Sequence, residues 1–284
     1  MAKYAKLDED EAVLFDTKNS YYAGIVRMAL AERSISYTSQ YVSLPKQEQL
    51  APWYLRMNPA GLVPAFQAAS GEIVNDSRNI VNWAYGTKES AAEREVLDKL
   101  YSEDPGSLAW LSGEKRIPLL KVMVNSPLIK IMLPKKIAKL QAENPDLHDV
   151  YKKRLEAMSK KHFSKSITQV QANLQSVVDW LEAKRQKGRG PWLLGSGFGR
   201  ADAVAVAFLQ WISRCNEYGA APVEIPAGLL DFLERAKARP SYQQALGQYG
   251  EDAFVLTMIR KANGRAGCML CSLALLAVGA GVFA

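Results

Sequence analysis

The sequence has little cysteine: only three residues among 284, and two of them, Cys268 and Cys271, lie three positions apart near the end of the chain. So few cysteines cannot supply a disulfide framework, and we expect the globular part to occupy a reducing compartment. An apolar N-terminal segment is also lacking, because residues 1–10 mix charged and small side chains. We therefore expect neither a secretory signal nor a transit peptide.

The segment from Asn58 to Pro64, Asn-Pro-Ala-Gly-Leu-Val-Pro, places strict demands on the backbone. Pro59 disfavours a helical conformation at Asn58, so a helix over residues 52–56 should end there. Gly61 permits a positive φ within the turn. Pro64 cannot donate a ladder hydrogen bond and fits only the first residue or the edge of the following strand. The segment is either a site for an extended peptide or a plain loop before a hairpin.

The elements around this turn predict a small α/β domain. Residues 13–16 form a short strand, and Ser20 could cap a helix from residue 21 to residue 33. Residues 35–44 are rich in β-branched and aromatic side chains, which favours a second strand. Residues 72–77 predict a further strand that ends in an Asp-Ser pair opening a helix. The predicted order is strand, helix, strand, helix, strand, strand, helix.

This order resembles the thioredoxin-like N-terminal domain of a glutathione transferase. The resemblance implies that Val63 pairs through its backbone with the cysteinyl part of glutathione, and that Pro64 is cis. It also implies that Asp76 and Ser77 hold the γ-glutamyl end. Ser20 matches the catalytic serine of serine-type transferases; the alternative is that it only caps the helix. No cysteine lies in this region, which excludes a cysteine-type reductase.

A second, helical domain is predicted after a linker over residues 86–95. Helical patterns cover residues 91–101, 146–184, 200–213 and 226–238. Residues 192–195 followed by Ala201-Asp202 resemble the motif that starts the core helix of the transferase C-terminal domain. Gly199 holds the cap position, and Asp202 can reach back to it as in a capping box. Asp202 is therefore predicted to be structural rather than catalytic.

Positive charge is concentrated between residues 113 and 165, where 13 Lys or Arg face five Asp or Glu. This segment has a net charge of +8, compared with +7 for the whole chain, and looks like an insertion relative to ordinary transferases. Lysines interleaved with apolar clusters suit an anionic membrane or an acidic partner. The alternative is a solvated helical face with a disordered tip. No recognition motif points to nucleic acid, so we expect no such partner, and we predict no metal site.

The last 19 residues, 266–284, are uncharged and mostly apolar. As a helix they would span about 28 Å, close to the roughly 30 Å hydrocarbon thickness of a bilayer. Arg260, Lys261 and Arg265 lie just upstream, as expected of a cytosolic flank. We predict a transmembrane anchor over residues 263–284, the alternative being a buried soluble helix. Cys268 and Cys271 could be acylated or form a redox pair, but an apolar tail lacks the electropositive setting that activates a thiol.

A transferase fold with a terminal anchor resembles the ganglioside-induced differentiation-associated protein 1 family. The match is carried by four passages: residues 42–45 with 52–58, residues 142–147, residues 191–195 with 201–202, and residues 239–247. The resemblance implies a tail-anchored protein of the mitochondrial outer membrane, sometimes of peroxisomes, that faces the cytosol and acts in organelle fission and redox balance. One difference is that family tails end in a few basic residues, whereas this sequence ends at Ala284.

The sequence thus predicts three parts. Residues 1–87 form an α/β thioredoxin-like domain, residues 88–262 an all-α transferase domain carrying the basic insertion, and residues 263–284 a transmembrane helix. Glutathione is the expected ligand or cosubstrate, with weak or no conjugation. The alternative is a membrane-anchored, active glutathione S-transferase that conjugates glutathione to electrophiles. The expected partners are a membrane, through the anchor and through anionic lipid at the insertion, and a second copy of the chain in a homodimer.

Overall fold

The computed structural model describes residues 11–247, except residues 19, 45, 110, 112–126, 160–165 and 219–220. Its sheet has four strands in the order β2-β1-β3-β4. Their bounds are Val13–Asp16 for β1, Thr38–Tyr41 for β2, Ala65–Gln67 for β3 and Ile73–Asn75 for β4. β1 runs parallel to β2 and antiparallel to β3, and β3 is antiparallel to β4.

Both faces of β1 are buried, because helices cover the sheet on each side. Alternate side chains of a strand point to opposite faces. Leu14 contacts the cluster under α1 (Tyr21–Glu32) and α3 (Ser77–Tyr85). Val13 and Phe15 contact the cluster under α2 (Pro52–Met57). Residues 13–15 therefore form a continuous apolar run. The element order confirms the predicted thioredoxin-like domain.

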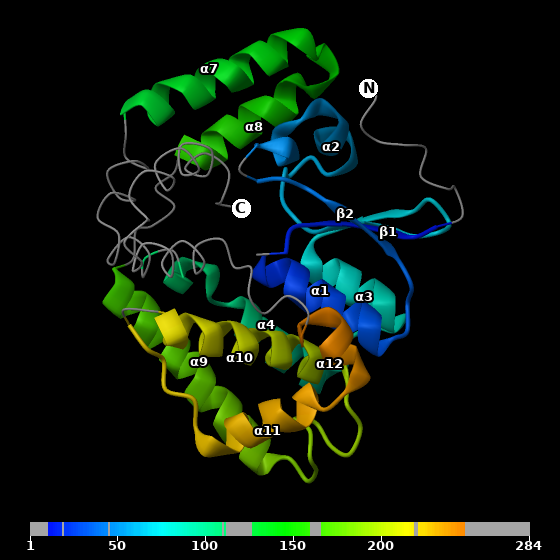
Figure 1. Cartoon of the computed structure of the whole chain (residues 1–284), viewed down its shortest axis with the longest axis vertical. Helices are drawn as coiled ribbons and strands as arrows, with labels where there is room; N and C mark the ends of the chain where they lie inside the picture. The colour runs from blue at the N-terminus through cyan, green and yellow to red at the C-terminus, as the bar shows by residue number, and fades with distance from the viewer. Residues whose placement is uncertain are drawn as a thin grey trace, which may run out of the picture.

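The second domain is helical and packs against the side of α1 and α3 away from the sheet (Figure 1). Its helices are α4 (Ala91–Tyr101), α9 (Ile167–Lys187), α10 (Arg200–Tyr218), α11 (Ala227–Lys237) and α12 (Pro240–Ala245). The first ten residues of α10, 200–209, are all buried, and the next residue, Gln210, is partly buried. A helix buried all round forms the centre of a helical domain.

Three sequence expectations need correction. The strand expected over residues 35–44 is only the four residues of β2. The helical pattern over 146–184 is not one helix: α8 (His148–Ser159) and α9 are separate elements, preceded by a 3-10 helix, η2 (Pro145–Leu147). The expected linker over 86–95 is shorter, because the Ser90 side chain and Glu93 form a capping box that starts α4 at Ala91.

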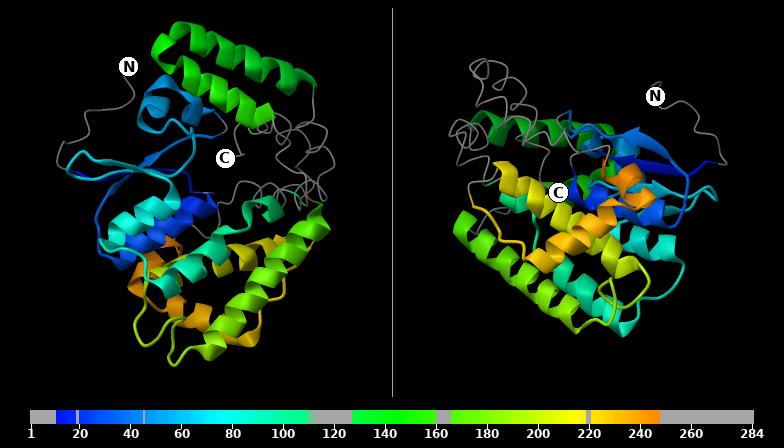
Figure 2. Two further views of the ribbon diagram at one scale, coloured as in Figure 1. Left: turned by 180° about the vertical axis from the view of Figure 1, so that it is seen from behind. Right: turned by 60° about the horizontal axis from the view of Figure 1, so that its bottom comes forward.

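The basic insertion contains a helix that its sequence pattern did not predict. α7 (Pro127–Glu143), with Pro134 inside it, and α8 form an antiparallel hairpin. Figures 1 and 2 show this hairpin over α2, at the end of the molecule opposite α11. The hairpin is not simply a solvated face. Its buried Ile137, Leu147 and Tyr151 contact Leu50 and Leu55, which belong to the 3-10 helix η1 (Glu48–Leu50) and to α2.

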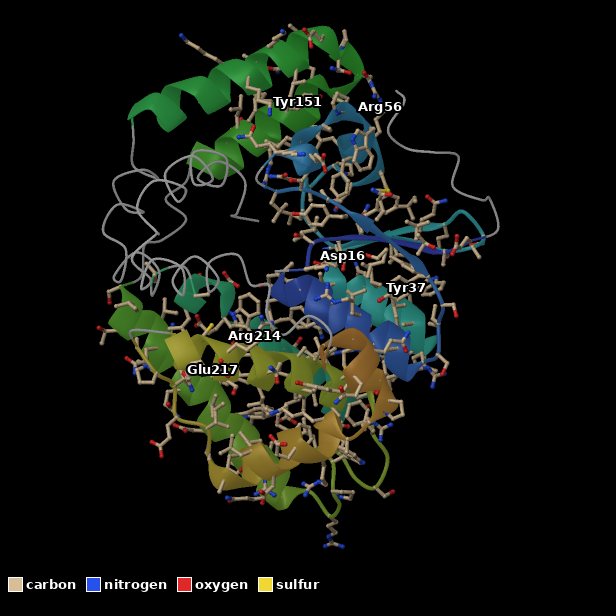
Figure 3. All side chains as sticks on the ribbon, in the orientation of Figure 1. Asp16, Tyr37, Arg56, Tyr151, Arg214 and Glu217 are labelled. Carbon is tan, nitrogen blue, oxygen red and sulfur yellow. The ribbon has the colours of Figure 1, made fainter. Side chains whose placement is uncertain are left out.

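Polar contacts add to this junction between the hairpin and the first domain. The Tyr151 hydroxyl donates to the Leu50 carbonyl at 3.0 Å, and Arg56 pairs with Asp146 at 2.9 Å; Figure 3 labels Tyr151 and Arg56. Lys136 Nζ also donates to Gln47 at 2.6 Å. The buried apolar contacts dominate, because both side chains of the Arg56–Asp146 pair are about half exposed and such pairs contribute little.

Over the described ranges, no helix combines the length and the apolar character needed to span a bilayer. The predicted anchor, residues 263–284, lies outside those ranges.

Candidate functional site

Three chain segments that carry predicted site residues meet at one edge of the sheet. Phe15 pairs with Ala65, and Ala65 pairs with Asn75. β1 therefore ends, β3 begins and β4 ends at the same edge, since antiparallel neighbours run in opposite directions. Ser20 follows β1, Val63 and Pro64 precede β3, and Asp76 and Ser77 follow β4. The topology thus brings all five residues to this edge.

The turn before β3 is fixed by side chains of α2 and its C-terminal end. The Tyr54 hydroxyl donates to the Leu62 carbonyl at 2.5 Å, and Asn58 Nδ2 donates to the same oxygen at 2.8 Å. Asn58 Oδ1 accepts from the Ala60 N–H at 3.2 Å. Gly61 has φ +60° and faces Leu55 Cδ2 so closely that a Cβ would lie 3.1 Å away. Glycine is therefore required at this position for both backbone and packing reasons.

The turn presents Val63 in an extended position just outside the sheet. The Val63–Pro64 peptide bond is cis. Val63 lies before the first ladder pair of β3, and within the described ranges its N–H and C=O make no backbone hydrogen bond. Backbone groups that are left unpaired beside a strand can receive an extended peptide as if it were a further strand.

Asp76 and Ser77 lie at the junction of β4 and α3 and differ in accessibility. Asp76 is exposed and has φ +74°. Its Oδ1 accepts from the N–H groups of Arg78 at 2.9 Å and Asn79 at 3.3 Å, so Asp76 is the N-cap of α3. Ser77 is buried, and its hydroxyl donates to the Tyr101 hydroxyl at 3.2 Å. Ser77 is therefore held by α4 of the second domain.

Tyr101 also connects this corner to α1. The Tyr22 ring stacks on Tyr101 with centroids 6.4 Å apart, and the Tyr22 hydroxyl donates to Asp104 at 3.4 Å. Burial raises the pKa of both tyrosines well above the ordinary value. Their hydroxyls therefore stay protonated and serve as hydrogen-bonding groups. Sequence reasoning missed Tyr101, and nothing marks it beyond its place at the end of a predicted helix.

Ser20 caps α1, as its alternative role predicts. Its Oγ accepts from the Ala23 N–H at 3.2 Å. A serine hydroxyl has one hydrogen and two lone pairs. The cap uses a lone pair, so the hydrogen is still available to donate to a ligand.

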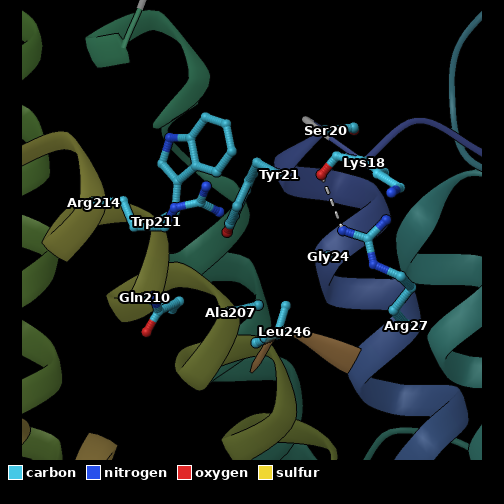
Figure 4. A pocket seen from close by; sticks show the side chains of 10 residues that line it. All are labelled: Lys18, Ser20, Tyr21, Gly24, Arg27, Ala207, Gln210, Trp211, Arg214 and Leu246. Atoms are coloured by element: carbon cyan, nitrogen blue, oxygen red, sulfur yellow. Dashed lines mark hydrogen bonds between the residues drawn. The ribbon is translucent and has the colours of Figure 1, made fainter. Parts of the chain in front are cut away.

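A cavity lies on the α10 side of Ser20 (Figure 4). Its wall includes Lys18 and Ser20, which precede α1, Tyr21 at the start of α1, and Trp211 and Arg214 from α10. Ser20 is the one predicted ligand-site residue that lines it. The turn before β3 and the start of α3 do not border this cavity. The candidate site therefore has two parts, the sheet-edge surface with Val63, Pro64, Asp76 and Ser77, and this cavity. Ser20 lies between them.

Arg27, which also lines the cavity, forms a buried ion pair. Arg27 Nη1 and Asp16 Oδ2 are 2.6 Å apart, and both side chains are almost fully buried; Figure 3 labels Asp16. Arg27 also donates to the Ala245 carbonyl at 3.2 Å and to the Lys18 carbonyl at 3.4 Å, the latter drawn in Figure 4. The pair therefore ties the end of β1 and α1 to the end of α12.

Asp202 makes structural hydrogen bonds at the start of α10. Its Oδ2 accepts from the Gly199 N–H and its Oδ1 from the Leu193 N–H, both at 2.8 Å. Burial raises the pKa of Asp202 to about 6, although these backbone hydrogen bonds oppose the shift. The carboxylate caps the helix and fixes the preceding turn. Within the described ranges no group of His, Cys, Asp and Glu could hold a metal ion.

Comparisons with known proteins agree with this architecture. The family model described as glutathione S-transferase, N-terminal domain, matches residues 19–86, and that for the C-terminal domain matches residues 119–221. Glutathione S-transferase TCHQD of Arabidopsis thaliana is 26% identical over 240 residues, which cover 79% of this chain and 85% of that protein. The two models together match more than half of the chain.

A solved structure extends the likeness to the fold. The glutathione transferase URE2P8 from Phanerochaete chrysosporium, with oxidized glutathione, superposes with a TM-score of 0.54 at 16% identity, covering 86% of this chain and 97% of that one. The fold is that of a two-domain glutathione transferase, with a thioredoxin-like α/β domain and a helical domain.

The chain belongs to the glutathione S-transferase family. Within it, the human ganglioside-induced differentiation-associated protein 1-like 1 is 24% identical over 292 residues, covering 87% of this chain and 76% of that protein. This match confirms the resemblance drawn from the sequence.

Proposed function

We propose that this protein is a membrane-anchored, glutathione transferase-like protein that binds glutathione at the sheet edge and conjugates it weakly or not at all. The observation that carries the proposal is the juxtaposition of an unpaired Val63 backbone with the start of α3. The solved relative that holds oxidized glutathione supports the choice of ligand.

The sheet edge offers complementary groups for a γ-glutamyl peptide. The Val63 N–H and C=O would pair with the cysteinyl backbone, and Pro64 sets the direction of that segment. Asp76 is exposed and uses Oδ1 for capping, so Oδ2 can accept from the ligand ammonium group. The Ser77 N–H, at the first position of α3, is an orphan donor suited to a carboxylate. The Ser77 hydroxyl donates to Tyr101 and would contribute only as an acceptor.

The alternative function is an active glutathione S-transferase. It is favoured by one observation: Ser20 retains a hydroxyl hydrogen that could stabilise a thiolate near the N-terminus of α1. A thiolate is the nucleophile in such a reaction, and donors near the sulfur lower the thiol pKa. The family resemblance supports weak conjugation, so binding and turnover must be measured separately.

The test is calorimetric titration of the full-length chain in detergent with millimolar reduced glutathione. The double variant Asp76→Ala/Ser77→Ala should weaken binding about tenfold or more, because it removes the charge-assisted hydrogen bond to the Asp76 carboxylate, about 1.5–3 kcal/mol, and the Ser77 hydroxyl acceptor, while the Ser77 N–H remains. Asp231→Ala, an exposed carboxylate on α11, is the control and should bind as wild type does. Ser20→Ala should keep binding but reduce any conjugation about 10²-fold or more. If wild type gives no heat, the glutathione proposal is wrong.

The membrane part of the proposal concerns residues 263–284. Their apolar sequence and basic upstream flank support an anchor. By family resemblance, we propose the mitochondrial outer membrane, and in addition peroxisomes, as the location, with a role in organelle fission and redox balance. A homodimer is part of the same proposal. Light scattering of the detergent-solubilised chain tests it: a mass of one chain at micromolar concentration would contradict it.

The α7–α8 hairpin is the proposed contact with anionic lipid. Lys135 and Lys139 are exposed on it, whereas Lys136 bonds to Gln47 and is left intact. Lys135→Glu/Lys139→Glu should weaken binding to anionic liposomes at low salt, where the Debye length is about 30 Å at 0.01 M. Lys187→Glu/Arg189→Glu applies the same charge change at the far end of the molecule and is the control. Equal binding by both variants would contradict the lipid contact.

A further inference from the structure

The short helix α2 lies between two apolar clusters that are anchored by neighbouring residues. Tyr54 belongs to the cluster between α2 and the sheet, which also contains Val63. Leu55 belongs to a second cluster together with Leu50 of η1. Every other described member of that second cluster, buried or partly buried, comes from residues 137–155 of the α7–α8 hairpin. The apolar cover of Leu50 and Leu55 is therefore supplied by the docked hairpin.

The same helix holds both parts of the sheet-edge surface. Side chains of α2 and of its C-cap donate two hydrogen bonds to the Leu62 carbonyl, just before Val63. The Met57 carbonyl at the end of α2 accepts from Nδ2 of Asn75 at 2.9 Å. Asn75 is the last residue of β4 and leads directly to Asp76. The position of α2 therefore sets both the turn before β3 and the end of β4.

The hairpin contacts the chain on both sides of α2. Before the helix, the Tyr151 hydroxyl of α8 donates to the Leu50 carbonyl at 3.0 Å. After the helix, Arg154 Nε of α8 lies 3.6 Å from the point where a Cβ on Gly61 would lie. Leu55 Cδ2 lies 3.1 Å from the same point. α8 is thus placed to hold η1, α2 and the turn in one arrangement.

α2 needs such support because it has only six residues. Isolated helices shorter than about 12–15 residues are marginal in water, so their stability comes from tertiary packing. Tyr54 and Leu55 are both fully buried, the first against the sheet and the second against the hairpin. Loss of the docked hairpin would leave α2 anchored on its sheet side and uncover an apolar side chain on the other.

We propose that the α7–α8 hairpin positions the glutathione site by holding α2, and through α2 the turn before β3 and the end of β4. This inference rests on the proposed glutathione binding. Tyr151 is a positioning residue in this arrangement, because it acts through η1 and α2 rather than on the ligand. The docked hairpin and the bound ligand favour the same position of α2. Each therefore strengthens the other, and this coupling is reciprocal.

The first experiment compares three variants of the full-length chain. Tyr151→Ala removes a fully buried ring and its hydrogen bond to η1. Phe232→Ala is the matched control, because Phe232 is an equally buried aromatic residue on α11, at the opposite end of the molecule (Figure 1). Tyr151→Phe keeps the ring and loses only the hydroxyl, so it tests rescue by a conservative change.

The readout that needs no ligand is hydrogen–deuterium exchange of the peptide covering residues 58–64, measured in detergent. Its Ala60 and Gly61 amides donate to Asn58, so their exchange reports opening of the turn. Exchange should be about tenfold faster in Tyr151→Ala than in Phe232→Ala, because the loss of local contacts lowers the free energy of local opening. Tyr151→Phe should exchange at nearly the wild-type rate.

The readouts with ligand are affinity and protection of the hairpin. If the turn is competent in about a tenth of the molecules, apparent affinity falls by the same factor. Calorimetric titration should therefore give Tyr151→Ala about tenfold weaker binding of reduced glutathione than Phe232→Ala. In wild type, saturating glutathione should also slow exchange of residues 148–156 of α8. A hairpin with a merely structural role would exchange at the same rate with and without the ligand.

The outcomes separate a failure of this inference from a failure of the proposed function. Equal exchange of residues 58–64 in Tyr151→Ala and Phe232→Ala would overturn the positioning role, even if wild type binds glutathione. Equal glutathione affinity of these two variants would also overturn it. Wild type that gives no heat with glutathione would overturn the proposed binding itself, and with it the positioning of that site.

Discussion

Replacement of Arg27 by methionine tests the buried Arg27–Asp16 ion pair of the first domain, whose arginine also donates to the Ala245 carbonyl at the end of α12. Methionine keeps much of the length and apolar volume of the side chain but removes the guanidinium. Asp16 would then remain almost fully buried, with only the Ser39 hydroxyl, at 2.9 Å, among the hydrogen bonds described for its carboxylate. The Ala245 carbonyl would also lose its Arg27 donor. Removing one partner of a buried pair typically costs about 3–5 kcal/mol.

The assay is thermal unfolding of the full-length chain in detergent, followed by circular dichroism at neutral pH. With about 2–4 °C per kcal/mol for domains of 150–250 residues, the melting temperature should fall by roughly 10 °C. Lys237→Met is the matched control, because Lys237 forms a partly exposed pair with Glu234 at 2.7 Å on α11. Exposed pairs at this helical spacing contribute about 0.5 kcal/mol or less.

A second variant separates the lost pair from lost packing. Arg27→Met combined with Asp16→Leu removes both charges and should recover part of the stability, because no buried charge is left unpaired. A single variant that melts within a degree or two of the Lys237→Met control would refute the reasoning. A double variant with a lower melting temperature than Arg27→Met alone would also refute the reasoning.

Three further predictions concern the anchor, a buried carboxyl and the turn. Full-length protein should resist carbonate extraction from membranes, whereas a chain ending at Ala262 should be released; equal release would show that residues 263–284 are no anchor. The raised pKa of Asp202, about 6, means that its protonation favours the fold. That contribution is complete below pH 3.8 and is lost as the pH rises through 6. The difference in unfolding free energy between wild type and the Asp202→Asn variant should therefore fall by up to about 3 kcal/mol between pH 4 and pH 7. A difference that stays constant over this pH range would contradict the prediction. Gly61→Ala should cost more than about 1 kcal/mol in urea unfolding, because φ is positive and Leu55 is close; an unchanged midpoint would contradict it.

The sequence by itself determined most elements of the first domain, because their signals are local. The β1 strand, the Ser20 cap of α1 and the end of α2 before Pro59 all follow from neighbouring side chains and backbone restrictions. The same holds for the cap of α10, where Asp202 reaches Gly199 only three residues away. Interactions within a helical turn are visible in the spacing of residues.

Local signals failed where tertiary contacts decide the structure. α7 was not predicted, because its sequence contains Pro134 and its apolar residues lack a helical period. It is stabilised instead by the contact of Ile137 with η1 and α2. The separation of α8 from α9 was missed for a similar reason, since both have helical patterns and the break between them carries no proline or glycine.

The candidate site shows the same division. Residue types and turn geometry nominate Val63, Pro64, Asp76 and Ser77 from the sequence. Only the pairing of β1, β3 and β4 brings them to one edge, because the order of strands in a sheet depends on long-range hydrogen bonds. The contact of Ser77 with Tyr101 and the approach of Arg154 to Gly61 join elements far apart in the chain. No local pattern encodes such contacts, since they depend on how whole helices pack against the sheet.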